Sequence, residues 1–472
     1  MVLLMKQILL HIKFSLLSNG YKKLILILFL VSPALSQAQN SQTFDVYSKN
    51  LLNESVNSLV TLAENSNRAA PFTTLRTDIN TVFNSVPAVL KTIDAINALQ
   101  NQKTEAFAAF LPKVSVSAGS GTKDQRLTTY ASDGGSSSKS ISASQLIYDF
   151  GTSTSTYASA EAKLSATEYS AYSQRSEILL QMISATLDYQ KSNQSLVFTK
   201  GFIDTRKDFL EIMRQKEDLG AGSKLDIIRA RTKLSEALDE LPVAEKKLIA
   251  SQATYKNLFG FTPKLKEISY QTPLNLNVEL NKKPDDIIVD INAFKEADNI
   301  ARSLKEDYFA SRGRLFGAVT VEASRTLSRD YPLNQNAVNT AMVIYRADIF
   351  AGFAQSSRAK ALASKASEAE FERDRVRRDL IKRLEVAQAD VNSTQAGFRT
   401  RLDLLKGSQA TDIATRELFL LNRGSLTDVF KAQEDVFSAA QKLIAADFDR
   451  KIAIYTFLHL SDRLIELFDL KI

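Results

Sequence analysis

The chain repeats itself, and this internal duplication constrains its fold more than any other feature of its 472 residues. The segment GSKLD at 222–226 returns as GSLTD at 424–428, an offset of 202 residues. The same offset relates identical charged residues upstream, Arg175 to Arg377 and Asp188 to Asp390. Because the offset holds without a gap from about 147 to 232, the sequence indicates a tandem duplication.

The first half contains a pattern typical of a β-hairpin. An alternating segment at 114–118 is followed by a polar region rich in Gly and Ser at 119–140, and a second strand-like segment returns at 141–150. The alternation is less regular around 143–146, where we expect a bulge. The sequence therefore predicts a hairpin over 113–150.

The second half repeats this pattern. The segment 319–323 alternates, 324–340 contains turn residues, and 341–350 alternates again. We predict a second hairpin over 316–350. Strands of roughly 9–11 residues would suit a tilted crossing of a bilayer.

A long helix is predicted after each hairpin, over 152–220 and 353–421. Both segments lack proline and are rich in Ala, Leu, Glu, Lys, Gln and Arg, which favour helices. About 69 residues at 1.5 Å each give a rod of roughly 100 Å. Apolar residues recur every three to seven positions in the second rod, as in a coiled coil: Val376, Leu380, Leu384, Val391, Phe398, Leu402 and Leu405. Shorter return helices are expected over 224–259 and 426–470.

These elements divide the chain into five parts. We predict a signal peptide at 1–38, a periplasmic N-terminal extension at 39–82, a first repeat at 83–262 with a helical lead-in, a Pro-bearing linker at 263–285, and a second repeat at 286–472.

The N-terminal segment has the organisation of a secretory signal peptide. Lys22 and Lys23 precede an apolar run at 24–31, and Ser36-Gln37-Ala38 places small residues at a cleavage site. The apolar run is too short to span a bilayer, and Met5 is an alternative start. An exported chain without a longer apolar helix is periplasmic, secreted, or embedded in an outer membrane as a barrel.

Composition argues against several functional classes. The formal net charge is +7, and four lysines of the signal segment account for more than half of it, so a nucleic-acid binder is not indicated. Cysteine is absent and histidine occurs only at 11 and 459. A disulfide framework, a His-based metal site and a Ser-His-Asp triad are therefore not expected, and we predict no enzymatic activity and no cofactor.

Each rod ends at a glycine-containing turn with the S-x-x-D pattern of a capping box. The residues are Gly222, Ser223 and Asp226 in the first half, and Gly424, Ser425 and Asp428 in the second. In this pattern the serine caps the new helix, the carboxylate reaches back to a free backbone N–H, and the glycine permits a tight turn. Capping alone would explain both aspartates.

A second interpretation of the aspartates is functional. Two such turns per chain at the end of an oligomeric tunnel would form a carboxylate ring, which favours cations and can hold an aperture closed through ionic contacts. Arg229 and Lys431 lie three residues after Asp226 and Asp428, and either pairs along its own helix or with a neighbouring turn.

The order of these parts resembles the TolC family of outer-membrane efflux and secretion channels. The resemblance covers about 80–472 and rests on AFAAFLP at 106–112, LIYDFG at 146–151, the two Gly-x-x-x-Asp turns, and LFG at 258–260. It implies a mainly α fold with β strands: a long antiparallel helical coiled-coil barrel, plus four strands per chain that form a shared twelve-stranded β-barrel in a homotrimer.

The resemblance also implies an exit duct in the outer membrane with most of its mass in the periplasm. Its tip, where Asp226 and Asp428 would lie, opens when a periplasmic adaptor and an inner-membrane transporter dock. The second turn departs from the family, because Lys431 replaces a second aspartate and Leu421 a frequent tyrosine. The gating network therefore cannot be transferred. Efflux of small molecules and type I protein secretion stay open as alternatives.

Competing interpretations are a periplasmic coiled-coil adaptor, a secreted helical structural protein and an exported carboxylate enzyme. An adaptor would show a lipoyl-like β-domain, which the sequence lacks. The paired hairpins and the duplication count against a structural protein, and no paired acidic constellation supports an enzyme.

Overall fold

The computed structural model describes most of the chain after residue 50. The described residues are 51–65, 73–127, 130–220, 222–263, 280, 282–330 and 335–470. The predicted signal peptide at 1–38 and most of the predicted linker lie outside them.

The chain divides into two compact units, each assembled from three stretches of sequence. Unit 1 comprises residues up to 60, 196–244 and 408–437, and unit 2 comprises 61–195, 245–407 and 438–472. Unit 2 holds both hairpins, whereas unit 1 holds both glycine turns.

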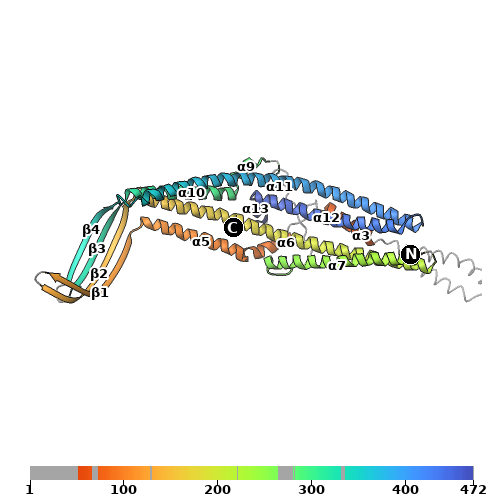
Figure 1. Cartoon of the computed structure of the whole chain (residues 1–472), viewed down its shortest axis with the longest axis horizontal. Coiled ribbons are helices and arrows are strands. Elements are labelled where there is room, and N and C mark those ends of the chain that lie inside the picture. The colour runs from red at the N-terminus through yellow and green to blue at the C-terminus, as the bar shows by residue number, and fades with distance from the viewer. Residues whose placement is uncertain are drawn as a thin grey trace, which may run out of the picture. The chain divides into compact units, whose positions relative to one another are not determined.

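Unit 2 contains one antiparallel sheet in the order β1-β2-β3-β4 (Figure 1). Its strands are β1 Lys113–Leu127, β2 Tyr130–Tyr148, β3 Ala318–Asp330 and β4 Gln335–Arg346. The predicted mainly α fold with four strands is confirmed. The strands extend through most of the regions predicted as turns, because backbone pairing continues along Gly- and Ser-rich sequence as regularly as along apolar sequence.

The expected bulge lies at the end of β2. The register between β2 and β3 shifts between Leu146 and Tyr148, just after the predicted 143–146. Gln145 donates from Nε2 to the carbonyl oxygen of Phe110 at 2.9 Å, which ties this part of β2 to the chain that enters β1.

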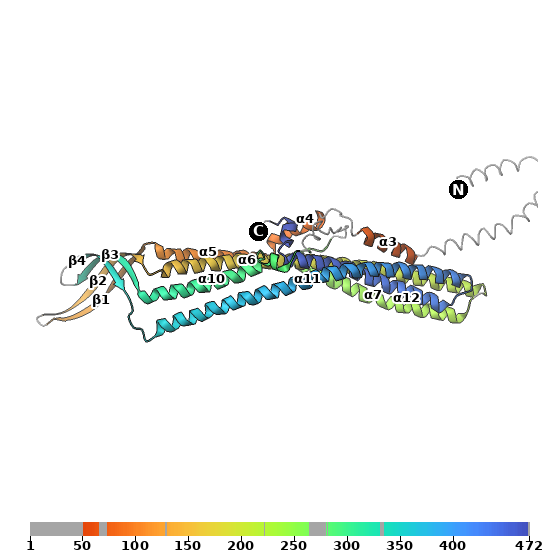
Figure 2. The ribbon, with the colours of Figure 1, turned by 90° about the horizontal axis from the view of Figure 1, so that it is seen from above.

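The helices of unit 2 that lead into the sheet are α5 Pro87–Phe107 and α10 Asn292–Gly313. Proline suits the first turn of α5, where a backbone N–H has no intrahelical partner. Short 3₁₀ turns, η1 Phe83–Ser85, η2 Ala108–Phe110 and η3 Arg314–Phe316, flank these helices. Helix α5, the first part of α6 and α10 run side by side from the sheet (Figure 2).

The two predicted rods are present as α6 Thr152–Asp218 and α11 Ala354–Leu420. Each has 67 residues and is therefore about 100 Å long. Leu384, Val391, Phe398 and Leu405 of the predicted stripe are almost completely buried, so this stripe is the packing face of α11.

The return helices are α7 Lys224–Phe259 and α12 Leu426–Leu460. The prediction of one helix over 426–470 is wrong, because α12 ends and α13 Leu464–Phe468 follows. Asp462 between them is left-handed, with φ of 58°, and the N–H of Arg463 donates to the carbonyl of Leu458 at 2.8 Å. This is a Schellman ending, for which no glycine signals in the sequence.

Three short helices complete the described chain: α3 Leu51–Asn65, α4 Thr73–Val82 and α9 Pro284–Ile288. Arg76 of α4 forms an ion pair with Asp469, and its Nε donates to the carbonyl of Phe468 at 3.2 Å. These contacts attach the C-terminal segment to α4 within unit 2.

Candidate functional site

The two faces of the sheet differ sharply in chemistry. Its register places one set of side chains on what we term the apolar face: Val114, Val116, Ile141, Ala143, Val319, Val321, Ala323, Val343 and Tyr345. The opposite set forms the hydroxyl face: Ser115, Ser117, Ser140, Ser142, Ser144, Thr320, Ser324, Thr326, Ser328 and Thr340. One rung crosses all four strands as hydroxyls only.

Hydrogen bonds join the members of that rung in pairs. Ser115 and Ser142 are 2.7 Å apart through their hydroxyl oxygens, and Ser324 and Thr340 are 2.6 Å apart. Such ladders satisfy polar groups side by side. On β4 the same face also carries Val338, Met342 and Ile344.

Exposure along β3 shows which face lies on the outside of the bend. Val321, Ala323 and Leu327 of the apolar face are exposed, whereas Glu322 and Ser324 on the hydroxyl face are half-buried. In a curved sheet the concave side is the more enclosed, so the hydroxyl face is concave and the apolar face convex. The bend of the sheet is visible in Figure 1.

Aromatic side chains gather where the strands meet the helices. The rings of Tyr148 and Phe150 are 4.9 Å apart, and those of Phe150 and Phe316 are 5.5 Å apart. Phe350 contacts Phe353 with a ring distance of 5.4 Å. We term these junction rings the aromatic girdle, and they pack against one another.

In unit 1 the two glycine turns are built alike, and serine caps both return helices. Ser223 Oγ accepts from the N–H of Leu225 at 3.2 Å, and Ser425 Oγ accepts from the N–H of Thr427 at 3.1 Å. The acidic half of the predicted box is absent: among the described residues, neither Asp226 nor Asp428 accepts a hydrogen bond from the serine N–H. Each serine therefore caps without help from the aspartate.

The left-handed positions of the turns lie two residues before the predicted glycines. Gly220 has φ of 71° and Asn422 has φ of 55°, and these two residues are related by the same offset of 202. The N–H of Asn422 donates to Phe419 at 3.0 Å and that of Arg423 to Leu418 at 2.8 Å, which completes a Schellman motif.

Gly222 and Gly424 are required for a different reason, the close approach of the chain to the last helical turn. A Cβ at Gly222 would lie 2.8 Å from the backbone nitrogen of Glu217, and one at Gly424 would lie 3.0 Å from that of Phe419. Neither contact can be relieved by a side-chain rotation, so glycine is needed at both sites.

The charged residues after the turns differ between the halves. Arg229 lies 3.8 Å from Asp226, an i,i+3 ion pair on a half-exposed surface. Asp428 is exposed, and within the described chain no ion pair within 4.0 Å joins it to Lys431. In the described chain only Arg229 pairs along its own helix, and pairing of Lys431 with a neighbouring turn stays a prediction.

A hydrophobic cluster under the turns connects the two repeats. It contains Phe209, Leu210 and Met213 of α6, Ala230 of α7, and Leu426, Val429 and Phe430 of α12. The rings of Phe209 and Phe430 are 5.4 Å apart in an edge-to-face arrangement. Since these residues come from both halves, this end of unit 1 is held together by packing between repeats.

A charged network beside this cluster was not anticipated from the sequence. The buried guanidinium of Arg206 donates to Gln433 at 2.7 Å, lies 3.6 Å from Glu434, and stacks on Phe430. Lys233 of α7 reaches the same Glu434 at 2.9 Å. Burial lowers the pKa of Arg206 to about 10, which Glu434 opposes.

Glu434 therefore joins α6 and α7 of the first repeat to α12 of the second. Helical periodicity alone does not reveal this, because Arg206 and Glu434 have no counterparts of like charge 202 residues away.

Comparison with known proteins relates part of the chain to one family. Residues 79–260, which include most of the predicted first repeat, match the model of the family described as outer membrane efflux protein.

One curated protein similar to this chain is the outer membrane efflux protein BepC of Brucella suis. The two are 22% identical over 335 residues, which cover 69% of this chain and 72% of BepC.

Solved channels share the fold. The CmeC outer membrane channel of Campylobacter jejuni matches with a TM-score of 0.72 at 13% identity, covering 83% of this chain and 86% of CmeC. The outer membrane protein VceC of Vibrio cholerae matches with a TM-score of 0.73 at 12% identity, covering 82% and 96%.

His459 lies in a closed, structural setting. His459 Nδ1 lies 2.8 Å from Ser176 Oγ, and its Nε2 lies 3.1 Å from Glu177. Burial lowers the pKa of His459. This Ser-His-Glu order has the connectivity of a hydrolytic triad, but Ser176 is fully buried within α6, so the hydroxyl is closed to any substrate.

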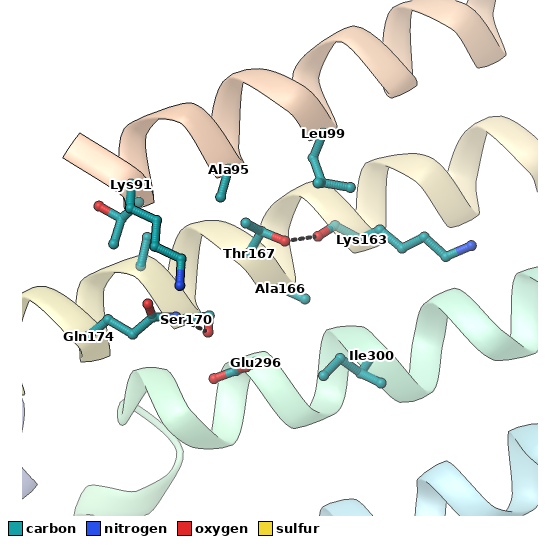
Figure 3. A pocket seen from close by; sticks show the side chains of 12 residues that line it. Lys91, Ala95, Leu99, Lys163, Ala166, Thr167, Ser170, Gln174, Glu296 and Ile300 are labelled. Atoms are coloured by element: carbon teal, nitrogen blue, oxygen red, sulfur yellow. Dashed lines mark hydrogen bonds between the residues drawn. The ribbon is translucent and has the colours of Figure 1, made fainter. Parts of the chain in front are cut away.

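A groove of about 400 Å³ lies over α6 between α5 and α10 in unit 2 (Figure 3). Small residues, including Ala166 and Ser170, form part of it, with Lys91 on one side and Glu296 on the other. Burial raises the pKa of Glu296, while a hydrogen bond with Ser170 opposes the shift. The lining combines one acid with scattered amines, hydroxyls and methyl groups, and we see in it a feature of helix packing.

None of the helices in the described ranges is long and apolar enough to cross a membrane. Across those same ranges, no group of three or more His, Cys, Asp or Glu side chains is placed to hold a metal ion.

Proposed function

We propose that this protein is the outer-membrane exit duct of a tripartite efflux or type I secretion system. In this proposal it is a homotrimeric, passive conduit without catalysis or cofactor, exported by a cleaved signal peptide. Three copies of the sheet form a twelve-stranded barrel, and the long helices form a tunnel in the periplasm.

The main support for this proposal is that the sheet is inverted: its apolar face is the exposed one. A sheet in a water-soluble protein turns its apolar face towards a core, whereas here the apolar face is convex and exposed, with Val114 at 66% and Val116 at 76%. Only a surrounding lipid phase makes this arrangement favourable, with the hydroxyl face lining water.

Open strand edges support assembly of several copies. β1 and β4 are the outer strands of the sheet, and in lipid their unpaired N–H and C=O groups would each cost several kcal/mol. Pairing of β4 with β1 of a second copy removes both edges, and three copies reach twelve strands, above the minimum of about eight for a bacterial barrel.

Uncovered apolar side chains in unit 1 support the same assembly. Leu225 and Ile228 of α7 are 51% and 59% exposed, and Leu421 at the end of α11 is 67% exposed. A soluble monomer would expose these large groups at the turns without compensation. Packing between copies would cover them.

At the turns we propose that Asp226 and Asp428 face the tunnel and select for cations. The described contacts support this role, because serine caps each helix by itself and leaves the carboxylates available. Arg229 offsets part of the charge of Asp226, so Asp428 contributes the greater share of the selectivity.

The proposed partners are a periplasmic adaptor and an inner-membrane transporter that supplies the energy. BepC is named as an efflux protein, which favours small-molecule efflux over protein secretion as the first hypothesis to test. Deletion of the gene should then raise sensitivity to toxic small molecules; normal sensitivity together with the loss of a secreted protein would assign the secretion role.

Channel activity can be tested directly. The full-length protein should fractionate with outer membranes, run as a trimer in mild detergent, and conduct ions in planar bilayers. Asp428→Asn should lower the preference for cations more than Asp226→Asn does. Recovery as a soluble monomer would contradict the channel, whereas unchanged selectivity in both variants would contradict only the role of the aspartates.

A further inference from the structure

Three cationic side chains lie on the apolar face of the sheet, towards the strand ends that are farther from the helices. Lys139 of β2 pairs across the strands with Leu327, and Arg325 and Arg329 of β3 pair with Ile141 and Ser137. All three side chains are exposed. We call this group, Lys139, Arg325 and Arg329, the basic collar.

The collar has no counter-charge in the described structure. Where side chains are described, no carboxylate lies within 4.0 Å of any of the three cations. At the same height the hydroxyl face carries Ser138, Ser140, Thr326 and Ser328. The positive charge is therefore confined to the convex face, and at this height it does not extend to the concave surface.

The outermost member of the collar, Arg329, lies at the height expected for one membrane interface. Val319 beside the aromatic girdle and Arg325 are six residues apart, or about 20 Å along the strand, and Arg329 is about 33 Å from Val319. For strands tilted by 35–45° these lengths correspond to roughly 15 Å and 25 Å above the girdle. A lipid-facing apolar band is about 25 Å tall, so Arg329 lies at its far edge.

The long side chains of Lys139 and Arg325 carry their charges towards the same edge. Their aliphatic stems lie on apolar surface while the charged ends reach the polar interface. Placing a cation at this depth costs free energy unless an anion pairs with it, and this cost falls steeply towards the interface. None of the described side chains supplies such an anion, whereas the headgroups of an anionic lipid would.

We propose that the basic collar binds the phosphate headgroups of an anionic lipid in the membrane leaflet farther from the helices. Guanidinium groups present a planar fork that matches phosphate oxygens with two parallel hydrogen bonds, and lysine adds a point charge. The proposal rests on the proposed function, because it requires the apolar face to lie in a bilayer.

The test uses the full-length trimer in detergent and measures retention of a bis-phosphorylated glycolipid, lipid A, by native mass spectrometry, with phosphatidylcholine as the neutral comparison. The wild type should retain lipid A, and Lys139→Gln/Arg325→Gln should lower its apparent affinity by about tenfold or more. Excess inorganic phosphate should not displace the lipid, since the acyl chains contribute to binding.

The matched control is Lys113→Gln/Arg346→Gln, which removes one lysine and one arginine from the concave face at the other end of the sheet. It should retain lipid A like the wild type. Equal retention by the collar variant and the wild type, equal loss in the control, or complete displacement by inorganic phosphate would overturn the lipid site. If the collar variant does not assemble, Arg329→Gln at the strand end provides the same comparison.

The two proposals fail in different ways. A wild-type trimer that conducts in bilayers but shows no preference for lipid A rejects only the collar. A protein that neither trimerises nor conducts rejects the channel itself.

Discussion

Glu434 and Asp462 show how single side chains bind parts of this protein together. Glu434 accepts from Lys233 and faces the buried Arg206, so one carboxylate serves two cations from the first repeat. Asp462 follows α12 and accepts a hydrogen bond from the N–H of Asn292, at the start of α10. Both carboxylates join segments that are far apart in the chain.

Glu434→Gln should weaken the connection between the repeats in unit 1. The neutral amide leaves the buried guanidinium of Arg206 without its nearest charge, and we expect a loss of about 1–3 kcal/mol of stability. If this connection also restricts the tunnel end, single-channel conductance in planar bilayers should rise.

The control is Glu236→Gln, which removes the other carboxylate near Lys233. Glu236 lies on the same helix as Lys233 at 2.7 Å, so it joins nothing between repeats. Equal effects of the two substitutions would show that Glu434 acts only through Lys233.

Asp462 makes stability depend on pH. Burial raises its pKa from 3.8 to about 6, against the hydrogen bond from Asn292. A carboxyl whose pKa is raised by folding binds its proton more tightly in the folded state. Its destabilising effect therefore grows as the pH rises from about 4 to 6, and it is complete above pH 6. The cost at neutral pH is at most about 3 kcal/mol.

Asp462→Asn should remove this dependence. Asparagine also accepts a hydrogen bond and tolerates left-handed backbone. The apparent melting temperature should exceed that of the wild type at pH 7.5, and the difference should disappear at pH 4. A difference that does not change with pH would show that charge is not the cause.

Helix α3 is an element without a counterpart in the duplication, and it lies against both rods. Its buried residues Leu52, Val56 and Leu59 form one face. Asn57 accepts from Gln409 of α11 at 2.9 Å, and Ser55 lies over Gly201 of α6. Within unit 1, α3 thus contacts α6 and α11 together.

Gly201→Leu should detach α3. A Cβ at Gly201 would already lie 2.9 Å from Ser55 Oγ, and a leucine side chain does not fit beneath the helix. Loss of burial of three apolar side chains should lower the free energy of local opening by at least about 2 kcal/mol. Hydrogen exchange of residues 51–65 should accelerate accordingly.

Gly407→Leu is the matched control, because it makes the same change within α11 where nothing lies within 4 Å of the added Cβ. Protection of α3 should be unchanged in this variant. Equal acceleration in both variants would indicate a general loss of helix packing.

At the scale of the whole molecule, the inverted sheet determines which surfaces would contact lipid and which would contact water. Val114 and Ser115 are adjacent in sequence but belong to opposite faces, since side chains alternate along a strand. In a barrel, one faces lipid and the other water. The pair therefore provides a test in which position in the chain is nearly constant and only the environment differs.

Val114→Arg should cost about 2–4 kcal/mol and reduce insertion and trimer yield, because the arginine is placed in the apolar band. Ser115→Arg should assemble normally and shift ion selectivity towards anions. Trimer content after extraction and reversal potentials in bilayers measure these outcomes. Equal tolerance of the two substitutions would mean that the convex face does not contact lipid.

Much of this architecture follows from local patterns in the sequence. The offset of 202 residues, the long proline-free segments and the period-2 segments indicate two rods and two hairpins, because helix propensity and side-chain alternation act over short distances. Serine capping at Ser223 and Ser425 is equally local. The left-handed Gly220 and Asn422 were not singled out, although the same offset relates them.

Tertiary structure decided the rest. The Arg206–Glu434–Lys233 network, the break in the second return helix at Asp462 and the docking of α3 depend on contacts between residues far apart in sequence, and no local pattern encodes them. The same holds for the two faces of the sheet. Alternation predicts that β3 has two faces, but only the register with β2 and β4 and the exposure of the side chains in the folded protein show which face is the outer one.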